Sequence, residues 1–241
     1  MRSLALAVLT LTLIGAPGSA HAGPAAPPRP DRVVAAAWVE GAFTIPSRLG
    51  YRVPVFSLYA DGRLLTSGDP DVHGVSTYRL ARLSPTEARD LRRSFFDATH
   101  DVDFGLVPVA DVGYTRTRAH FEGGVAWQRI NALGMDTGLT PAQRQARSRL
   151  QSIISGAIAV AATPFSPRHY EVRRIQIADP STQIEWPGPD LPAGDCGRLP
   201  AAAYDGFPAD FQQGRAYTWQ GSSFALWLRP LAPGEKGCRG L

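Results

Sequence analysis

The sequence predicts an α+β fold, an antiparallel sheet built from two β-hairpins with two helices packed on one face. Asp61-Gly62 and Gly123-Gly124 each separate two strand-like runs. Such pairs favour two-residue hairpin turns, because both turn positions need a positive φ. Two amphipathic segments follow the hairpins, and each opens with a capping sequence. Hairpins followed by capped helices therefore favour antiparallel pairing and helices gathered on one side.

The first turn sets a register. If Asp61-Gly62 forms a two-residue turn, Leu58 lies opposite Leu65, so that Phe56, Leu58 and Leu65 share a core face. Strands are predicted over 33–39, 53–60, 63–66, 75–82, 113–122, 125–134, 170–178 and 223–231.

Two helices are predicted from their N-terminal signals. Ser84 is a good N-cap, Pro85 suits the first helical position, and Glu87 completes a capping box. Thr140 and Pro141 repeat this pattern at the second helix. The apolar stripe of the first helix comprises Ala88, Leu91, Phe95 and Ala98, and that of the second Leu150, Ile153, Ile154, Ala157, Ile158 and Ala161.

The N-terminus has the pattern of a secretory signal peptide over 1–22. Arg2 supplies the positive region, Leu4 to Ile14 the apolar run, and small residues flank a cleavage point after Ala22. A Pro/Ala-rich linker over 23–32 precedes the α+β domain, residues 33–179. We expect a secreted protein with no membrane span in the mature chain, because the apolar runs are too short to cross a bilayer.

Residues 180–241 are rich in Pro and Gly, and we expect an irregular C-terminal extension packed on the same domain. Cys196 and Cys238 are the only cysteines, and an even pair in an exported chain predicts a disulfide. The scattered aromatic residues either anchor the extension to the body or stack on sugar rings; they are Trp186, Tyr204, Phe207, Phe211, Tyr217 and Trp219.

Composition and motifs exclude several function classes. A formal net charge of +4 over 241 residues gives no basis for nucleic-acid binding, which needs a concentrated basic face. The chain lacks Gly-x-Ser-x-Gly, His-Glu-x-x-His, Walker and Gly-x-Gly-x-x-Gly sequences, so we expect no cofactor. Acid–base pairs leave no such signature, so an enzyme stays open.

The stretch SGDPDVHG places Asp69, Asp71 and His73 at alternate positions, as a calcium loop begins. Leu80 stands where such a loop needs a bidentate glutamate, which excludes calcium. Zinc would need further ligands from elsewhere in the chain. The sequence therefore favours a polar turn, and no metal site is predicted.

The second hairpin offers a better candidate site. A Gly123-Gly124 turn would place His120 opposite Trp127 and Arg118 opposite Arg129, a like-charge pair that a bound anion or a carboxylate such as Glu122 would relieve. The alternatives are an anion-binding surface, with Trp127 and Tyr114 as flat platforms, and a solvated face covered by arginine stems. The candidate ligand-binding residues are Arg116, Arg118, His120, Trp127 and Arg129.

Three short stretches, FSLYADGRLL, RLSPTEARDL and INALG, resemble a group of uncharacterised secreted proteins of GC-rich Gram-positive bacteria. The resemblance covers about residues 50–135. Its motifs are a turn, a helix cap and a strand end, so it implies the layout of the fold and export, and no activity.

We therefore expect a non-catalytic envelope or extracellular binding module, whose partner is an anionic envelope polymer or another exported protein. The alternative is a secreted hydrolase that uses carboxylate or histidine groups the sequence does not assign.

Overall fold

The structure is a computed structural model that describes residues 29–41, 54–110, 112–177 and 184–238. The predicted signal peptide, its cleavage point and most of the Pro-rich linker lie outside the described residues. Export therefore stays a prediction from the sequence.

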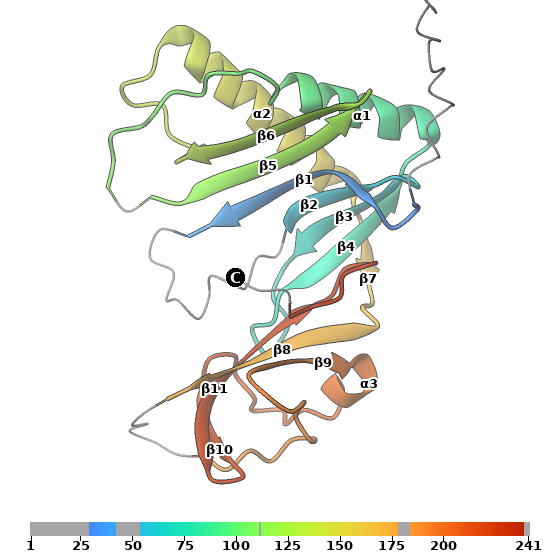
Figure 1. Ribbon diagram of the computed structural model, residues 1–241, viewed down its shortest axis with the longest axis vertical. Coiled ribbons are helices and arrows are strands. Elements are labelled where there is room, and N and C mark those ends of the chain that lie inside the picture. The colour runs from blue at the N-terminus through green and yellow to red at the C-terminus, as the bar shows by residue number, and fades with distance from the viewer. Residues whose placement is uncertain (1–28, 42–53, 111, 178–183, 239–241) are drawn as a thin grey trace, which may run out of the picture.

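Two antiparallel sheets and three helices form the described part of the chain, which confirms the α+β class (Figure 1). The large sheet has seven strands in the order β6-β5-β1-β2-β3-β4-β7. Its strands are β1 Val33–Glu40, β2 Pro54–Tyr59, β3 Arg63–Gly68, β4 Thr77–Arg82, β5 Tyr114–Phe121, β6 Gly124–Asn131 and β7 Thr163–Phe165.

Helices α1, Pro85–Asp97, and α2, Pro141–Val160, cover one face of this sheet (Figure 1). Both predicted capping boxes are present, at Ser84 and at Thr140. The predicted stripes face inward, and one apolar core joins the helices to the sheet; it includes Ala35, Phe56, Leu58, Leu64, Phe95, Ala119, Leu150 and Ile154. Among the described residues, no helix has the length and apolarity needed to cross a membrane.

The first hairpin differs from the predicted register by one residue. Its loop has three residues rather than two, since the Gly62 N–H donates to the Tyr59 carbonyl and Gly62 takes the left-handed conformation at φ 83°. Leu64 therefore pairs with Leu58, and Leu65 pairs with Ser57. A one-residue slip turns side chains to the opposite face. Leu64 therefore shares the face of Phe56 and Leu58, as predicted for Leu65, and Leu65 is instead buried in a second apolar cluster with Tyr59 and Tyr78.

The expected irregular extension instead forms most of a second sheet, with strand order β10-β11-β8-β9. The predicted strand near 170 is its third strand. Its strands β9 and β10 are short and lie among Pro and Gly residues, so they give no clear two-residue periodicity in the sequence. Its elements are β8 His169–Gln176, β9 Cys196–Pro200, helix α3 Ala201–Tyr204, β10 Ala216–Trp219 and β11 Ser222–Pro230.

The aromatic residues of the extension make the core of this small sheet. Trp186 contacts Phe207 and Tyr217 edge-on, at ring-centroid distances of 5.0 and 5.2 Å. Five of the six predicted aromatics are buried and the sixth, Trp219, packs against them. These side chains anchor the extension rather than form a stacking surface.

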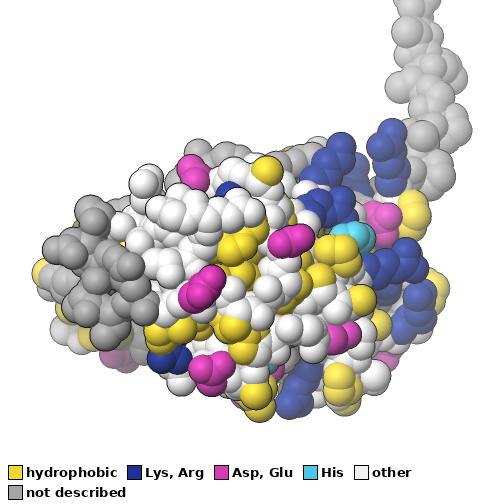
Figure 2. Space-filling view, turned by 90° about the horizontal axis from the view of Figure 1, so that it is seen from below, with side chains coloured by type: hydrophobic (Ala, Val, Ile, Leu, Met, Phe, Trp, Pro, Cys, Tyr) yellow, Lys and Arg dark blue, Asp and Glu magenta, His cyan; other side chains and the backbone are white. Residues whose placement is uncertain are grey.

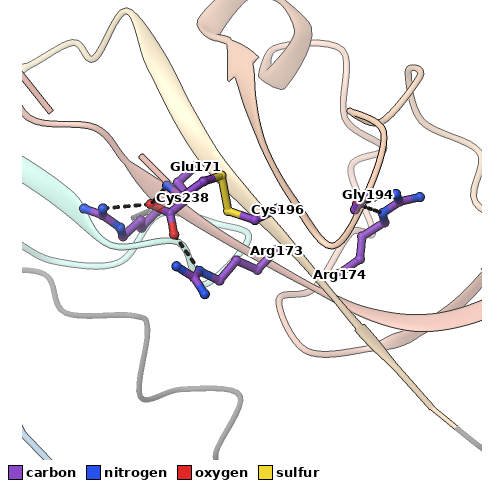
Figure 3. Close-up of a disulfide and its surroundings, with 7 residues drawn as sticks. Glu171, Arg173, Arg174, Gly194, Cys196 and Cys238 are labelled. Atoms are coloured by element: carbon purple, nitrogen blue, oxygen red, sulfur yellow. Dashed lines mark hydrogen bonds and ion pairs between the residues drawn. A yellow bond between two sulfur atoms is a disulfide. The ribbon is translucent and has the colours of Figure 1, made fainter. Parts of the chain in front are cut away.

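The C-terminal segment is fixed on the opposite face of the small sheet (Figure 3). The predicted disulfide is confirmed between Cys196 and Cys238, whose Cα atoms lie 5.6 Å apart. The Cys238 N–H donates to Glu171, which also accepts from Arg173 and Arg229. Burial opposes ionisation of Glu171, but the two arginines outweigh it and hold its pKa below the usual value. The chain end is thus held by a covalent bond and a buried ionic cluster.

Candidate anion-binding surface

The hairpin β5–β6 turns at Glu122 and Gly123, with φ of 46° and 84°, and Phe121 pairs with Gly124. Both turn positions have positive φ, as expected, but the turn lies one residue earlier than Gly123-Gly124. The pairing consequently shifts by two residues, so that Arg116 faces Arg129 and Arg118 faces Trp127. The predicted partners are wrong, while every side chain keeps its predicted face because the shift is even.

One face of this hairpin packs against the helices and buries Thr115, Thr117, Ala119, Phe121, Ala126 and Ile130. The other face carries all five predicted ligand-binding residues, which we call the arginine face: Arg116, Arg118, His120, Trp127 and Arg129. Their charges, however, have two different environments.

At one end of the arginine face, Glu40 of the neighbouring strand β1 lies between the opposed arginines and balances one of their two positive charges. Its carboxylate lies 2.7 Å from Arg116 Nε and 3.6 Å from Arg129 Nε. Glu40 is only 8% exposed, so solvent screens this attraction weakly. The expected carboxylate, Glu122, pairs instead with Arg89 and Arg93 of α1. We call Glu40, Arg116 and Arg129 the paired end.

The two aromatic platforms predicted beside these arginines each contact one of them, although Trp127 stays 55% exposed. Arg129 Cζ lies 3.7 Å from the ring centroid of Tyr114, and Arg116 Cζ lies 5.7 Å from that of Trp127. Both distances fall in the cation–π range. The arginines of the paired end therefore have partners within the molecule, so this end attracts an anion less than the other end does.

At the other end of the face, positive groups gather around His120. Arg32, just before β1, places Nη2 3.5 Å from His120 Nδ1, and Arg92 of α1 donates to the His120 carbonyl. Arg118 lies two residues before His120 on the same side of β5. Within the described chain, no carboxylate comes within ion-pairing distance of Arg32, Arg92 or Arg118. We call Arg32, Arg92, Arg118 and His120 the open end.

The open end carries the electrostatic signature of uncompensated charge. The pKa of His120 is lowered by burial and then by Arg118, Arg32 and Arg92. The pKa of Arg92 is lowered by burial and by Arg32, against a smaller opposing effect of Glu122. A nearby anion favours the protonated form of such a group, so its binding would relieve the repulsion among these positive charges.

Two hollows adjoin the open end. A cavity of about 660 Å³ at the end of the large sheet is lined by three arginines, two carboxylates and an aromatic ring among other residues: Arg82, Arg89, Arg92, Asp61, Glu122 and Phe121. A smaller one of about 120 Å³ is lined by Arg118 and His120 with Trp38, Tyr59 and Glu235. Figure 2 views the molecule from below. On the surface seen in this view, basic side chains gather on one side while acidic ones are scattered. Charge on the surface is thus unevenly distributed.

The Asp69/Asp71/His73 stretch is a turn after β3 that contacts the small sheet's aromatic core. Asp71 accepts N–H groups of His73 and Val75 at 2.9 and 3.0 Å, and its other oxygen accepts the Tyr204 hydroxyl. His73 Nδ1 lies 3.2 Å from the Phe211 carbonyl. Across the described ranges, no three His, Cys, Asp or Glu side chains are grouped to hold a metal ion.

Asp69 lies 3.6 Å from Arg79, and its side chain is almost fully exposed. Val75 is buried in the core of the small sheet. The polar turn of the sequence therefore joins the β3–β4 loop to that core.

Sequence reasoning missed two residues of the open end and one structural arginine. Arg32 lies in the predicted linker and Arg92 on the first helix, so only the tertiary fold brings them to His120. Arg147 of α2 is 2% exposed and donates to the carbonyls of Phe104, Asn131 and Ala132. Its place on the apolar stripe, three residues before Leu150, is the signal that could have identified it.

Comparison of the chain with protein-family models, with curated proteins and with solved structures finds no match. The resemblance to secreted proteins of GC-rich bacteria stays a prediction, and the functional argument depends on the geometry of the arginine face.

Proposed function

We propose that the protein is an exported, non-catalytic binding module whose open end holds an anionic partner in the cell envelope. The observation that supports it is the group of three arginines around His120 with no carboxylate in contact, over the described residues. Its partner is an envelope polymer that carries phosphate or carboxylate groups, or an exported protein with an acidic surface.

Three physical properties of the open end favour this role. Guanidinium groups present planar donor forks that match carboxylate and phosphate oxygens. Arg92 is held in place by its bond to the His120 carbonyl, so less side-chain entropy is lost on binding. Mutual repulsion is already present in the free protein, and an anion removes it.

The hydrolase alternative gains no support from the carboxylates that are most strongly held. Both oxygens of Glu171 accept hydrogen bonds from arginines or from the Cys238 N–H. Asp71 is saturated by two N–H groups and a tyrosine hydroxyl. Each carboxylate is committed to holding the fold together, which is not the environment of a general base.

The test is retention on immobilised polyphosphate and on immobilised polyglutamate as salt is raised. We expect Arg32→Ala/Arg118→Ala to elute at clearly lower salt than wild type. The matched control is Arg168→Ala/Arg198→Ala, which removes the same charge from two exposed positions elsewhere. Equal shifts in the two double variants would show that retention follows net charge alone, and the proposal would be wrong.

A further inference from the structure

The outer strands of the two sheets differ in how well they are protected against pairing with another chain. Unpaired edges are usually kept short or interrupted by proline. Strand β7 has three residues and contains Pro164, and β10 has four residues. Strand β9 has five residues, of which the first is the disulfide-bonded Cys196 and the last is Pro200. Strand β6 has eight residues, none of them proline, and forms an outer margin of the large sheet (Figure 1). It is the long edge among these four.

The turn geometry shows which backbone groups of β6 face outward. In a two-residue hairpin the residues that flank the turn are hydrogen-bonded to each other, here Phe121 and Gly124. Bonded and non-bonded positions alternate along an antiparallel pair. The N–H and C=O groups of Val125, Trp127 and Arg129 therefore point away from β5, where the sheet order places no described strand.

The side chains along this edge are exposed on the arginine face. Val125 is 54% exposed and Trp127 is 55% exposed, and the side chain of Arg129 is 44% exposed. An aliphatic, an aromatic and a basic side chain thus alternate beside a row of free backbone groups. This combination suits an extended ligand, which takes affinity from main-chain bonds and specificity from alternate side chains.

The usable stretch is bounded at its far end and on the helix side. Arg147 Nη1 donates to the carbonyls of Asn131 and Ala132, which closes that end of β6. On the helix side, the Gln128 amide donates to the Thr99 and Val102 carbonyls. An incoming strand therefore has access to residues 125–129. Every second side chain of the incoming strand then lies on the arginine face, on the side of the sheet away from the helices.

We propose that β6 is a docking edge for an extended segment of another protein that carries acidic residues at alternate positions. Alternate acids lie on one face of a strand. Among the described residues, this face has Arg118 in no ion pair and Arg116 and Arg129 sharing the one carboxylate of Glu40, which leaves an excess of positive charge beside β6. The segment adds an eighth strand to the large sheet. The inference goes beyond the proposed function, because it depends on backbone pairing at β6 rather than on the open end.

The test uses three eight-residue fluorescent peptides at moderate salt: alternating Thr-Glu, alternating Thr-Lys, and a block peptide with four Thr followed by four Glu. We expect alternating Thr-Glu to bind at least several-fold more tightly than the other two. In wild type it should slow amide exchange at Val125, Trp127 and Arg129. If the block peptide binds equally well, attraction is only electrostatic and the proposal is overturned.

The matched variants are Val125→Pro, which removes one outward N–H, and Val125→Thr, which keeps it. We expect a loss of tenfold or more for Val125→Pro and near wild-type binding for Val125→Thr. Amide exchange in wild type decides the question if Val125→Pro fails to fold. If the Arg32→Ala/Arg118→Ala variant loses peptide affinity and Val125→Pro does not, the peptide binds at the open end. That result would overturn this inference and leave the proposed function intact. A concentration-dependent dimer that protects these amides without peptide would make a second copy the occupant and would also overturn it.

Discussion

The two ends of the arginine face both contain arginines of strand β5, yet they are electrostatically different. At the paired end, a buried carboxylate from β1 lies between two arginines that also stack on aromatic rings. At the open end, three arginines surround a histidine with no such carboxylate among the described residues. A row of arginines therefore does not identify a binding surface; the position of the nearest carboxylate does.

The largest expected effect comes from breaking the paired end. Glu40→Gln keeps the shape of the side chain but removes the charge that holds Arg116 and Arg129. Loss of the buried negative charge between two guanidinium groups predicts a decrease of about 2 kcal/mol in the free energy of unfolding, a value discounted for the partial exposure of both arginines. Urea denaturation measures it.

Glu122→Gln is the control for Glu40→Gln. Its ion pairs to Arg89 and Arg93 are exposed and long, at 3.5 and 3.6 Å. Exposed pairs contribute little, so we expect a loss of about 0.5 kcal/mol or less. If both variants lose the same stability, burial does not distinguish the two carboxylates and the comparison fails.

A smaller effect is expected from pH at the open end. The pKa of His120 is lowered in the folded state, so folding favours the neutral ring. Its contribution is fully present above the unfolded pKa of about 6.5 and is lost as pH falls through that value toward the folded pKa. We expect His120→Gln to lose this part of the acid destabilisation, measured as the free energy of unfolding between pH 8 and 5.

The charged groups around His120 explain why stability is expected to fall, rather than rise, at low pH. They are Arg32 before β1, Arg92 on α1, Arg118 on β5, and Glu235, which shares the small hollow but is paired with Arg229. Added polyphosphate should raise the pKa of His120 and reduce the loss at low pH. An identical pH profile in wild type and His120→Gln would mean that the ring is not held among uncompensated charges.

The smallest effect is expected from Arg118→Ala on stability. Arg118 is exposed, and it has like charges as neighbours. Its removal should leave the free energy of unfolding unchanged or slightly higher, within about 0.5 kcal/mol. A loss well above that in urea denaturation would show that its stem packs on the sheet and that its role is structural.

The sequence predicted the sheet face of a side chain more accurately than its cross-strand partner. An even shift in the second hairpin preserved the arginine face, whereas the one-residue shift at Gly62 moved Leu65 from the predicted face to the opposite one, where it is also buried. Capping boxes and the disulfide were predictable because their signals are local or depend on a single pair of residues. The small sheet was missed because its short strands lack a clear period, although its aromatic residues were noted.

The candidate site could be predicted only in part. Arg118 and His120 were found from the alternation of one strand. Arg32, Arg92 and Glu40 were not, because they reach the hairpin from other elements, and no local pattern specifies which charges meet in space. The distinction between the two ends is therefore a property of the tertiary fold.

The most direct test of that distinction compares two single variants with the same change in charge, Arg118→Ala and Arg129→Ala, on immobilised polyphosphate. We predict that Arg118→Ala elutes at clearly lower salt than wild type. Arg129→Ala should elute close to wild type, because Glu40 and Tyr114 already hold that guanidinium. Equal shifts in the two variants, or a larger shift for Arg129→Ala, would contradict the account.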